Sequence, residues 1–130
     1  MHLKGTKPMP FDFVLDQLYS VSPVVKPMFG CHAVYVENKI VLILRKREDH
    51  LDDNGVWLAT EHVHHQTLRH EFPSMRSIKL FGARETAWQN LPFDALDFEE
   101  AVLHACSLII QGDKRIGKEA KLKKEPKRRK

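Results

Sequence analysis

The chain has 130 residues, of which 42% are hydrophobic and 29% are charged, and its formal net charge is +4. This length suits one domain, because two halves would each bury too little apolar surface to be stable. The composition excludes a wholly disordered chain, and the longest aliphatic run, residues 40–44, is far shorter than the roughly 20 residues of a membrane span. The first eight residues lack the apolar stretch of a secretory signal. We therefore expect a cytoplasmic protein with no membrane partner.

The first half of the chain predicts a helix followed by a β-hairpin. Apolar residues recur at the helical spacing i, i+3, i+4, i+7, which predicts an amphipathic helix over residues 11–20. Pro23 and Pro27 then interrupt the helical pattern. Residues 32–36 and 40–45 have strand-like composition and are joined by a short turn, so they predict a hairpin. The second strand begins with five apolar residues, which indicates a position near the sheet centre, and Arg45 is expected to bring its end out to solvent.

The middle of the chain alternates short apolar segments with turn signals. Residues 56–59 predict a third strand, and residues 61–72 have a helical pattern that Pro73 ends. Residues 78–81 predict a fourth strand. Residues 86–91, around one of the two tryptophans, predict a short strand or a turn.

The most regular helical pattern spans residues 97–111, with apolar residues on one face, acids in the first turn and Gly112 as a typical C-cap. The expected fold is α+β. It is a two-layer domain with an antiparallel sheet of about four or five strands, an N-terminal helix, one inserted helix and a long C-terminal helix. We assign residues 1–10 to a lead-in, 11–112 to the domain and 113–130 to a basic, flexible tail.

A short motif, Pro27-Met28-Phe29-Gly30, precedes the predicted hairpin. Together with the strand of residues 31–36, the turn at 37–39 and the apolar strand after it, this motif resembles the N-terminal domain of the TfoX/Sxy family of competence regulators. The resemblance covers residues 11–111 and is most specific at the hairpin. It implies an antiparallel sheet with helices packed against it. Our leading functional hypothesis is a non-enzymatic interaction or regulatory module of this type, which engages a protein partner of unknown identity.

The motif supplies the candidate ligand or interaction loop, which consists of Met28, Phe29 and Gly30. Glycine permits backbone conformations that other residues resist. Met28 and Phe29 can fill the space between the loop and the core, or they can line a ligand pocket. Packing is the commoner role of methionine and phenylalanine, so we favour it here.

Four histidines fall within residues 62–70. On a helix, His62 and His65 share a face, which makes them the candidate metal ligands. The segment has no HExxH motif, and Cys31 and Cys106 lack CxxC spacing, so zinc is not indicated. We favour a solvated histidine-rich helix face and two buried thiols. No catalytic constellation is recognised, and we predict no cofactor.

Charge is distributed unevenly along the chain. Residues 113–130 carry ten Lys/Arg and three Asp/Glu, whereas the other 112 residues carry 11 Lys/Arg and 14 Asp/Glu. Such a tail can bind phosphates without recognising a nucleotide sequence, so weak, non-specific nucleic-acid binding is the alternative function. The simpler interpretation is a solvated tail that binds nothing. The candidate contacts are Lys121, Lys123, Lys124, Lys127, Arg128, Arg129 and Lys130. A homodimer is also expected, because an uncovered sheet edge or face favours self-association.

Overall fold

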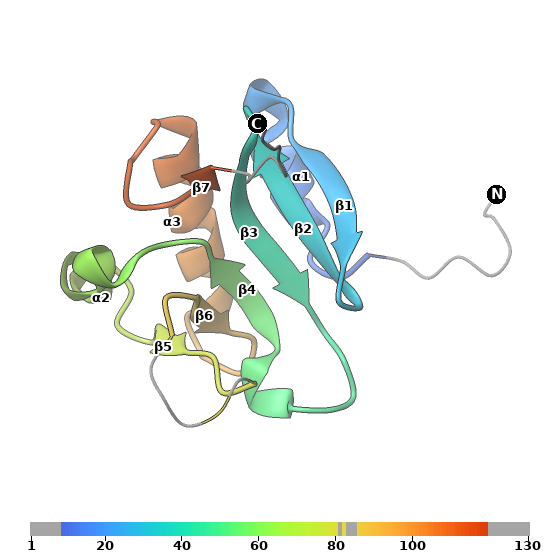
Figure 1. Ribbon diagram of the computed structural model, residues 1–130, viewed down its shortest axis with the longest axis vertical. Helices are drawn as coiled ribbons and strands as arrows, with labels where there is room; N and C mark the ends of the chain where they lie inside the picture. Colours follow the sequence, from blue (N-terminus) through green and yellow to red (C-terminus); the bar gives the residue numbers. More distant parts are fainter. Residues whose placement is uncertain (1–8, 81, 83–85, 120–130) are drawn as a thin grey trace, which may run out of the picture.

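The structure is a computed structural model that describes residues 9–80, 82 and 86–119 (Figure 1). In this part of the chain the helices are α1 (Phe13–Gln17), α2 (His65–Glu71) and α3 (Phe98–Ile110), with 3-10 turns at Tyr19–Val21, Leu51–Asp53 and His62–His64. The strands are β1 (Val24–Met28), β2 (Cys31–Val36), β3 (Lys39–Arg45), β4 (Gly55–Leu58), β5 (Arg76–Ser77), β6 (Gln89–Pro92) and β7 (Lys118–Glu119).

The seven strands form one antiparallel sheet in the order β1-β2-β3-β4-β6-β5, and β7 pairs with the start of β3. Helices α1 and α3 lie behind this sheet in Figure 1. The α+β class and the antiparallel sheet are confirmed. The long C-terminal helix is confirmed in part, since α3 has 13 residues but β7 follows it. The expected four or five strands are too few, because β1, β5 and β7 were not predicted.

The β1–β2 and β2–β3 connections are two-residue turns, Phe29-Gly30 and Glu37-Asn38. All four turn residues have positive φ, between 52° and 77°. Positive φ at both central residues defines the type I′ turn, whose twist matches that of the strands on either side. The two turns therefore set the register of the first three strands.

Strand β1 contains Pro27, which is why the sequence analysis did not predict a strand there. Among the described strands, β1 lies at the sheet edge and pairs only with β2. In a two-residue hairpin, the two residues that flank the turn, here Met28 and Cys31, are hydrogen-bonded to each other. Hydrogen-bonded and non-hydrogen-bonded pairs alternate along an antiparallel ladder, so the next residue, Pro27, directs its backbone nitrogen outward, away from β2. Proline is tolerated at such a position. Because the outer edge lacks one N–H donor, pairing with a further strand is disfavoured.

Two predicted elements of the middle segment need correction. Residues 78–80 are not in a strand, and residue 81 lies outside the described residues. Ile78 is nevertheless buried, so its apolar character reflects packing against the sheet rather than strand pairing. The predicted helix of residues 61–72 begins as a 3-10 turn, and Val63, which was expected on its buried face, is 79% exposed.

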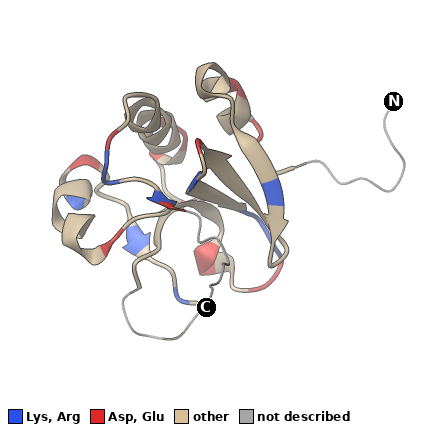
Figure 2. Ribbon diagram, turned by 45° about the horizontal axis from the view of Figure 1, so that its top comes forward, with Lys and Arg blue, Asp and Glu red and all other residues tan. Residues whose placement is uncertain are grey.

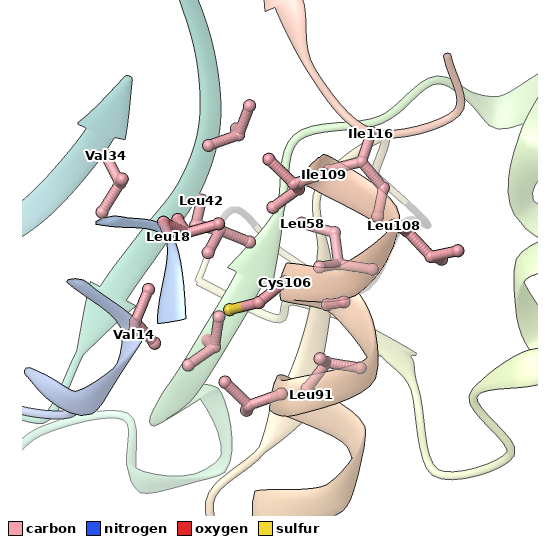
Figure 3. Packing of buried hydrophobic residues seen from close by; sticks show 14 of the residues in the cluster. Val14, Leu18, Val34, Leu42, Leu58, Leu91, Cys106, Leu108, Ile109 and Ile116 are labelled. Carbon is pink, nitrogen blue, oxygen red and sulfur yellow. The ribbon is translucent and has the colours of Figure 1, made fainter. Parts of the chain in front are cut away.

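The main hydrophobic core lies between the sheet and the helices (Figure 3). The apolar face predicted for α3 is confirmed by the burial of Val102, Ala105, Cys106 and Ile109. Side chains from other elements complete this core, among them Val14, Leu18, Val34, Leu42, Leu44, Val56, Leu58, Leu68, Phe72 and Leu91. Burial raises the pKa of the Cys106 thiol to about 12. Cys106 is therefore an inert core residue.

Gly112 ends α3 as predicted. Its φ is 77°, its N–H donates to the Ile109 carbonyl, and the Asp113 N–H donates to the Leu108 carbonyl. This pair of bonds is the Schellman motif, which satisfies carbonyls at the helix end and requires a left-handed residue.

The domain continues beyond Gly112 into residues that the sequence analysis assigned to the tail. Ile116 is only 5% exposed and joins the main core together with Ile109 (Figure 3). The Gly117 N–H donates to the Ala59 carbonyl at 2.7 Å, and β7 then pairs with β3. Residues 113–119 are thus part of the domain. A lone isoleucine in a polar run has no periodicity by which it could have been recognised.

Arg115 ties this segment to the helices. One of its terminal nitrogens, Nη2, lies 2.6 Å from a Glu71 carboxylate oxygen and 2.7 Å from an Asp113 carboxylate oxygen. His104 Nε2 lies 2.8 Å from the other Glu71 oxygen. The hydrogen bond from Arg115 lowers the pKa of Asp113 to about 2. Hydrogen bonds from His104 and then Arg115 hold the pKa of Glu71 below its usual range.

We predict that Ile116→Ala lowers the free energy of unfolding by about 2–5 kcal/mol, because it removes buried apolar atoms and leaves a cavity. Urea denaturation measures the loss. Lys114→Ala, at an exposed position two residues away, is the control and should change stability by less than about 0.5 kcal/mol. Equal stability of the two variants would contradict the burial of Ile116.

Candidate functional site

Phe29 lies at the tip of the β1–β2 hairpin and is 88% exposed. Its φ is 52°, a left-handed conformation that costs an L-residue about 1–2 kcal/mol and that Asn, Asp or Gly occupies more readily. The packing role that the sequence analysis favoured for Phe29 is therefore wrong, whereas Met28 does pack against buried residues of the sheet. An exposed aromatic residue in a strained conformation is a feature of contact sites.

A second apolar cluster covers the face of the sheet opposite the helices. Successive strand residues alternate between the two faces of the sheet. Ala33, Ile43 and Trp57 therefore lie on the face opposite the residues next to them in each strand, which enter the main core. The other buried members are Cys31, Ile40, Ala59 and Ile78, and the partly buried ones are Met28, Tyr35, Leu80 and Trp88. The sheet thus has apolar side chains on both faces.

A hollow of about 230 Å³ opens on this second face beside the hairpin tip. Its lining consists of Met28, Phe29, Cys31, Ile43, Trp57 and Leu80. Trp57 Nε1 donates to the Asp53 carbonyl at 2.8 Å, and burial raises the pKa of the Cys31 thiol, which is therefore not a reactive thiolate. Among the described residues, the lining of the hollow is apolar and includes no charged side chain.

Gly30, the next residue of the turn, lines a larger hollow of about 580 Å³, whose lining includes charged side chains. That lining consists of Pro10, Gly30, His32, Leu44, Lys46, Arg47, Glu48 and Asp49. Arg47 Nη1 donates to the Gly30 carbonyl at 3.2 Å, and a Cβ at position 30 would collide with the Arg47 guanidinium. Position 30 requires glycine both for this contact and for its φ of 77°.

Arg45 holds the loop that carries Arg47. Arg45, which was expected to reach solvent, is only 2% exposed. It donates to the His50 carbonyl, to Asn54 Oδ1 at 2.8 Å and to Asp49, with which it also forms an ion pair. Asn54 in turn accepts the Arg47 N–H and donates to the Arg47 carbonyl, each at 2.9 Å. The buried guanidinium therefore organises residues 46–54 from inside.

The two candidate metal ligands lie close together, with 4.9 Å between the ring centroids of His62 and His65. His65 is only 3% exposed, so the expected solvated face does not include it, and its Nε2 lies 3.1 Å from the Ala87 carbonyl oxygen. In residues 9–80, 82 and 86–119, no three His, Cys, Asp or Glu side chains form a group that could hold a metal ion.

The candidate nucleic-acid contacts of the basic tail, residues 121–130, lie outside the described residues. Over the described domain, Lys and Arg positions are interspersed with Asp and Glu positions (Figure 2). Within the described part of the chain, no helix has the length and apolar character needed to cross a membrane.

The chain was compared with protein-family models, with curated proteins and with solved structures, and none of them matches. The resemblance to the TfoX N-terminal domain accordingly stays a prediction.

We predict that Phe29→Asn raises the free energy of unfolding by about 0.5–1 kcal/mol, because Asn-Gly is a preferred type I′ sequence. Urea denaturation measures the gain. The control is Glu37→Asn in the other turn, where Glu37 also has a φ of 52° and should give a similar gain. If Phe29→Asn destabilised the fold while Glu37→Asn stabilised it, the Phe29 ring would be a packing residue rather than a contact residue.

Proposed function

We propose that the protein is a non-enzymatic interaction module that engages a protein partner through the tip of its β1–β2 hairpin. The observation that carries this proposal is Phe29, which is 88% exposed and has a φ of 52° beside an apolar hollow. Aromatic residues next to pockets are typical energetic centres of protein interfaces. A residue that is both strained and exposed contributes little to folding, so a contact outside the domain accounts for it.

The chemistry of the hollow favours a protein side chain as its occupant. Its volume of about 230 Å³ is below the roughly 300–1,000 Å³ of most small-molecule sites. A metabolite also needs polar groups that fix its orientation, whereas this lining is apolar and Trp57 Nε1 is already bonded to Asp53. An aromatic or branched aliphatic side chain matches both the size and the character of the hollow.

The sheet edge next to the tip favours contact through side chains rather than through an added strand. Strand addition requires a row of free N–H and C=O groups, and Pro27 removes one donor from the outer edge of β1. The partner is therefore expected to contact Phe29 and the apolar hollow on the sheet face.

This proposal predicts that a photo-crosslinking phenylalanine analogue at position 29 captures a protein in cells. The same analogue at position 63, where Val63 is 79% exposed on another element, is the control. Mass spectrometry of the products should identify one protein enriched at position 29 relative to position 63. Equal or absent crosslinking at the two positions would contradict the proposal.

A second candidate function, non-specific nucleic-acid binding, rests on the charge of the tail. All seven candidate basic residues follow Glu119, the last described residue. A chain that ends at Glu119 keeps Ile116 and β7, so it separates tail charge from folding better than a chain that ends at Gly112. Binding through the tail predicts that only the full chain is retained on DNA at low salt, with retention falling steeply as salt rises. Equal retention of both chains would exclude the tail as the binding element.

A further inference from the structure

We infer that the partner of the hairpin tip is a second copy of this chain, placed so that Phe29 of each copy enters the apolar hollow of the other. This inference rests on the proposed interaction role of the tip. A two-fold symmetric interface uses the same patch on both subunits, so the patch must carry both a projection and a complementary recess. Phe29 provides the projection, and it also forms one wall of the recess.

The recess has the size and chemistry to take a phenyl ring. An apolar cavity of about 150 Å³ can bind benzene, and this hollow measures about 230 Å³. Its lining includes Ile43 and Trp57, which are both buried, and Leu80, which is partly buried. A phenyl ring in this space replaces water at apolar side chains on both molecules, which is favourable.

In the described part of the chain, the charged residues next to Gly30 and Leu80 form two ion pairs, which favours a like surface over a strongly acidic or basic partner. Arg47, beside Gly30, forms an ion pair with Asp49 at 3.4 Å, and Lys79, next to Leu80, forms one with Asp52 at 3.3 Å. Arg47 and Asp49 also hold the Gly30 carbonyl and the buried Arg45, whereas Lys79 and Asp52 are 62% and 61% exposed and can exchange partners at low cost. A copy related by a two-fold axis presents the same Lys79 and Asp52, so opposite charges can meet across the interface.

The contact area indicates a weak, concentration-dependent dimer. One phenylalanine buries about 150–250 Å², so two rings and the walls they cover give well under the roughly 1,600 Å² of a standard interface. Pro27 limits extension of the contact along the edge of β1. We therefore expect a dissociation constant in the micromolar range or weaker.

The test uses purified full chain and sedimentation velocity from micromolar to millimolar protein concentration. The wild type should shift from monomer to dimer over this range. Phe29→Asn should keep its fold and raise the dissociation constant by at least about tenfold, whereas Glu37→Asn, the matched turn variant, should dimerise like the wild type. A wild type that stays monomeric throughout, or a Phe29→Asn variant that dimerises as well as Glu37→Asn, would overturn the inference.

Crosslinking then locates the ring. Normal and ¹⁵N-labelled copies that carry the photo-crosslinking analogue at position 29 are mixed, irradiated and digested. Products that join a light and a heavy copy, with the second attachment at Ile43, Trp57 or Leu80, support the inference. Products formed only within one copy overturn it. If position 29 crosslinks a different protein in cells while the purified chain stays monomeric, the interaction role stands and the second-copy inference fails.

Discussion

The double burial of β3 is the constraint on which the rest of the structure depends. Leu42 and Leu44 enter the main core under the helices, while Ile40 and Ile43 enter the second cluster on the opposite face. The β2–β3 register shifts between Val34 and Tyr35, which leaves Val41 as an extra residue in β3 that also faces the helices. Such a bulge re-aims side chains without breaking the sheet. Helices cover one face, and the second face supplies the walls of the apolar hollow.

The sequence predicted the parts of the fold that depend on local signals. The β2–β3 hairpin and α3 follow from strand composition and helical periodicity, and Gly112 follows from the geometry of helix ends. β1 was missed because Pro27 is unfavourable in a strand in general, and only the edge position of β1, which is a property of the whole sheet, makes it acceptable. Residues 78–81 were predicted to form a strand because their apolar pattern indicates burial. Such a pattern does not show whether the buried residues pair with a neighbouring strand or only pack against the sheet.

The candidate site was predicted less completely, because its members come together through long-range contacts. The motif indicates Met28, Phe29 and Gly30 as a candidate loop, but a packing role was expected for Phe29, since nothing local indicates that the turn points away from the core. Trp57 and Leu80 were not recognised as parts of the site, because their place beside the turn depends on strand order. The burial of Arg45 was also unforeseen, since its hydrogen-bond partners come from the loop that follows it.

The backbone of the hairpin tip is held by a chain of contacts that runs to it from the interior. The buried Arg45 bonds to Asn54, Asn54 bonds to the backbone of Arg47, and the Arg47 guanidinium bonds to the Gly30 carbonyl. On the other side of the turn, Met28 packs into the second cluster. A backbone that is held in place before binding loses less conformational entropy when it binds, so an anchored turn gains affinity from a small contact area. The loop of residues 46–54 is therefore as much a part of the contact surface as the hairpin that carries Phe29.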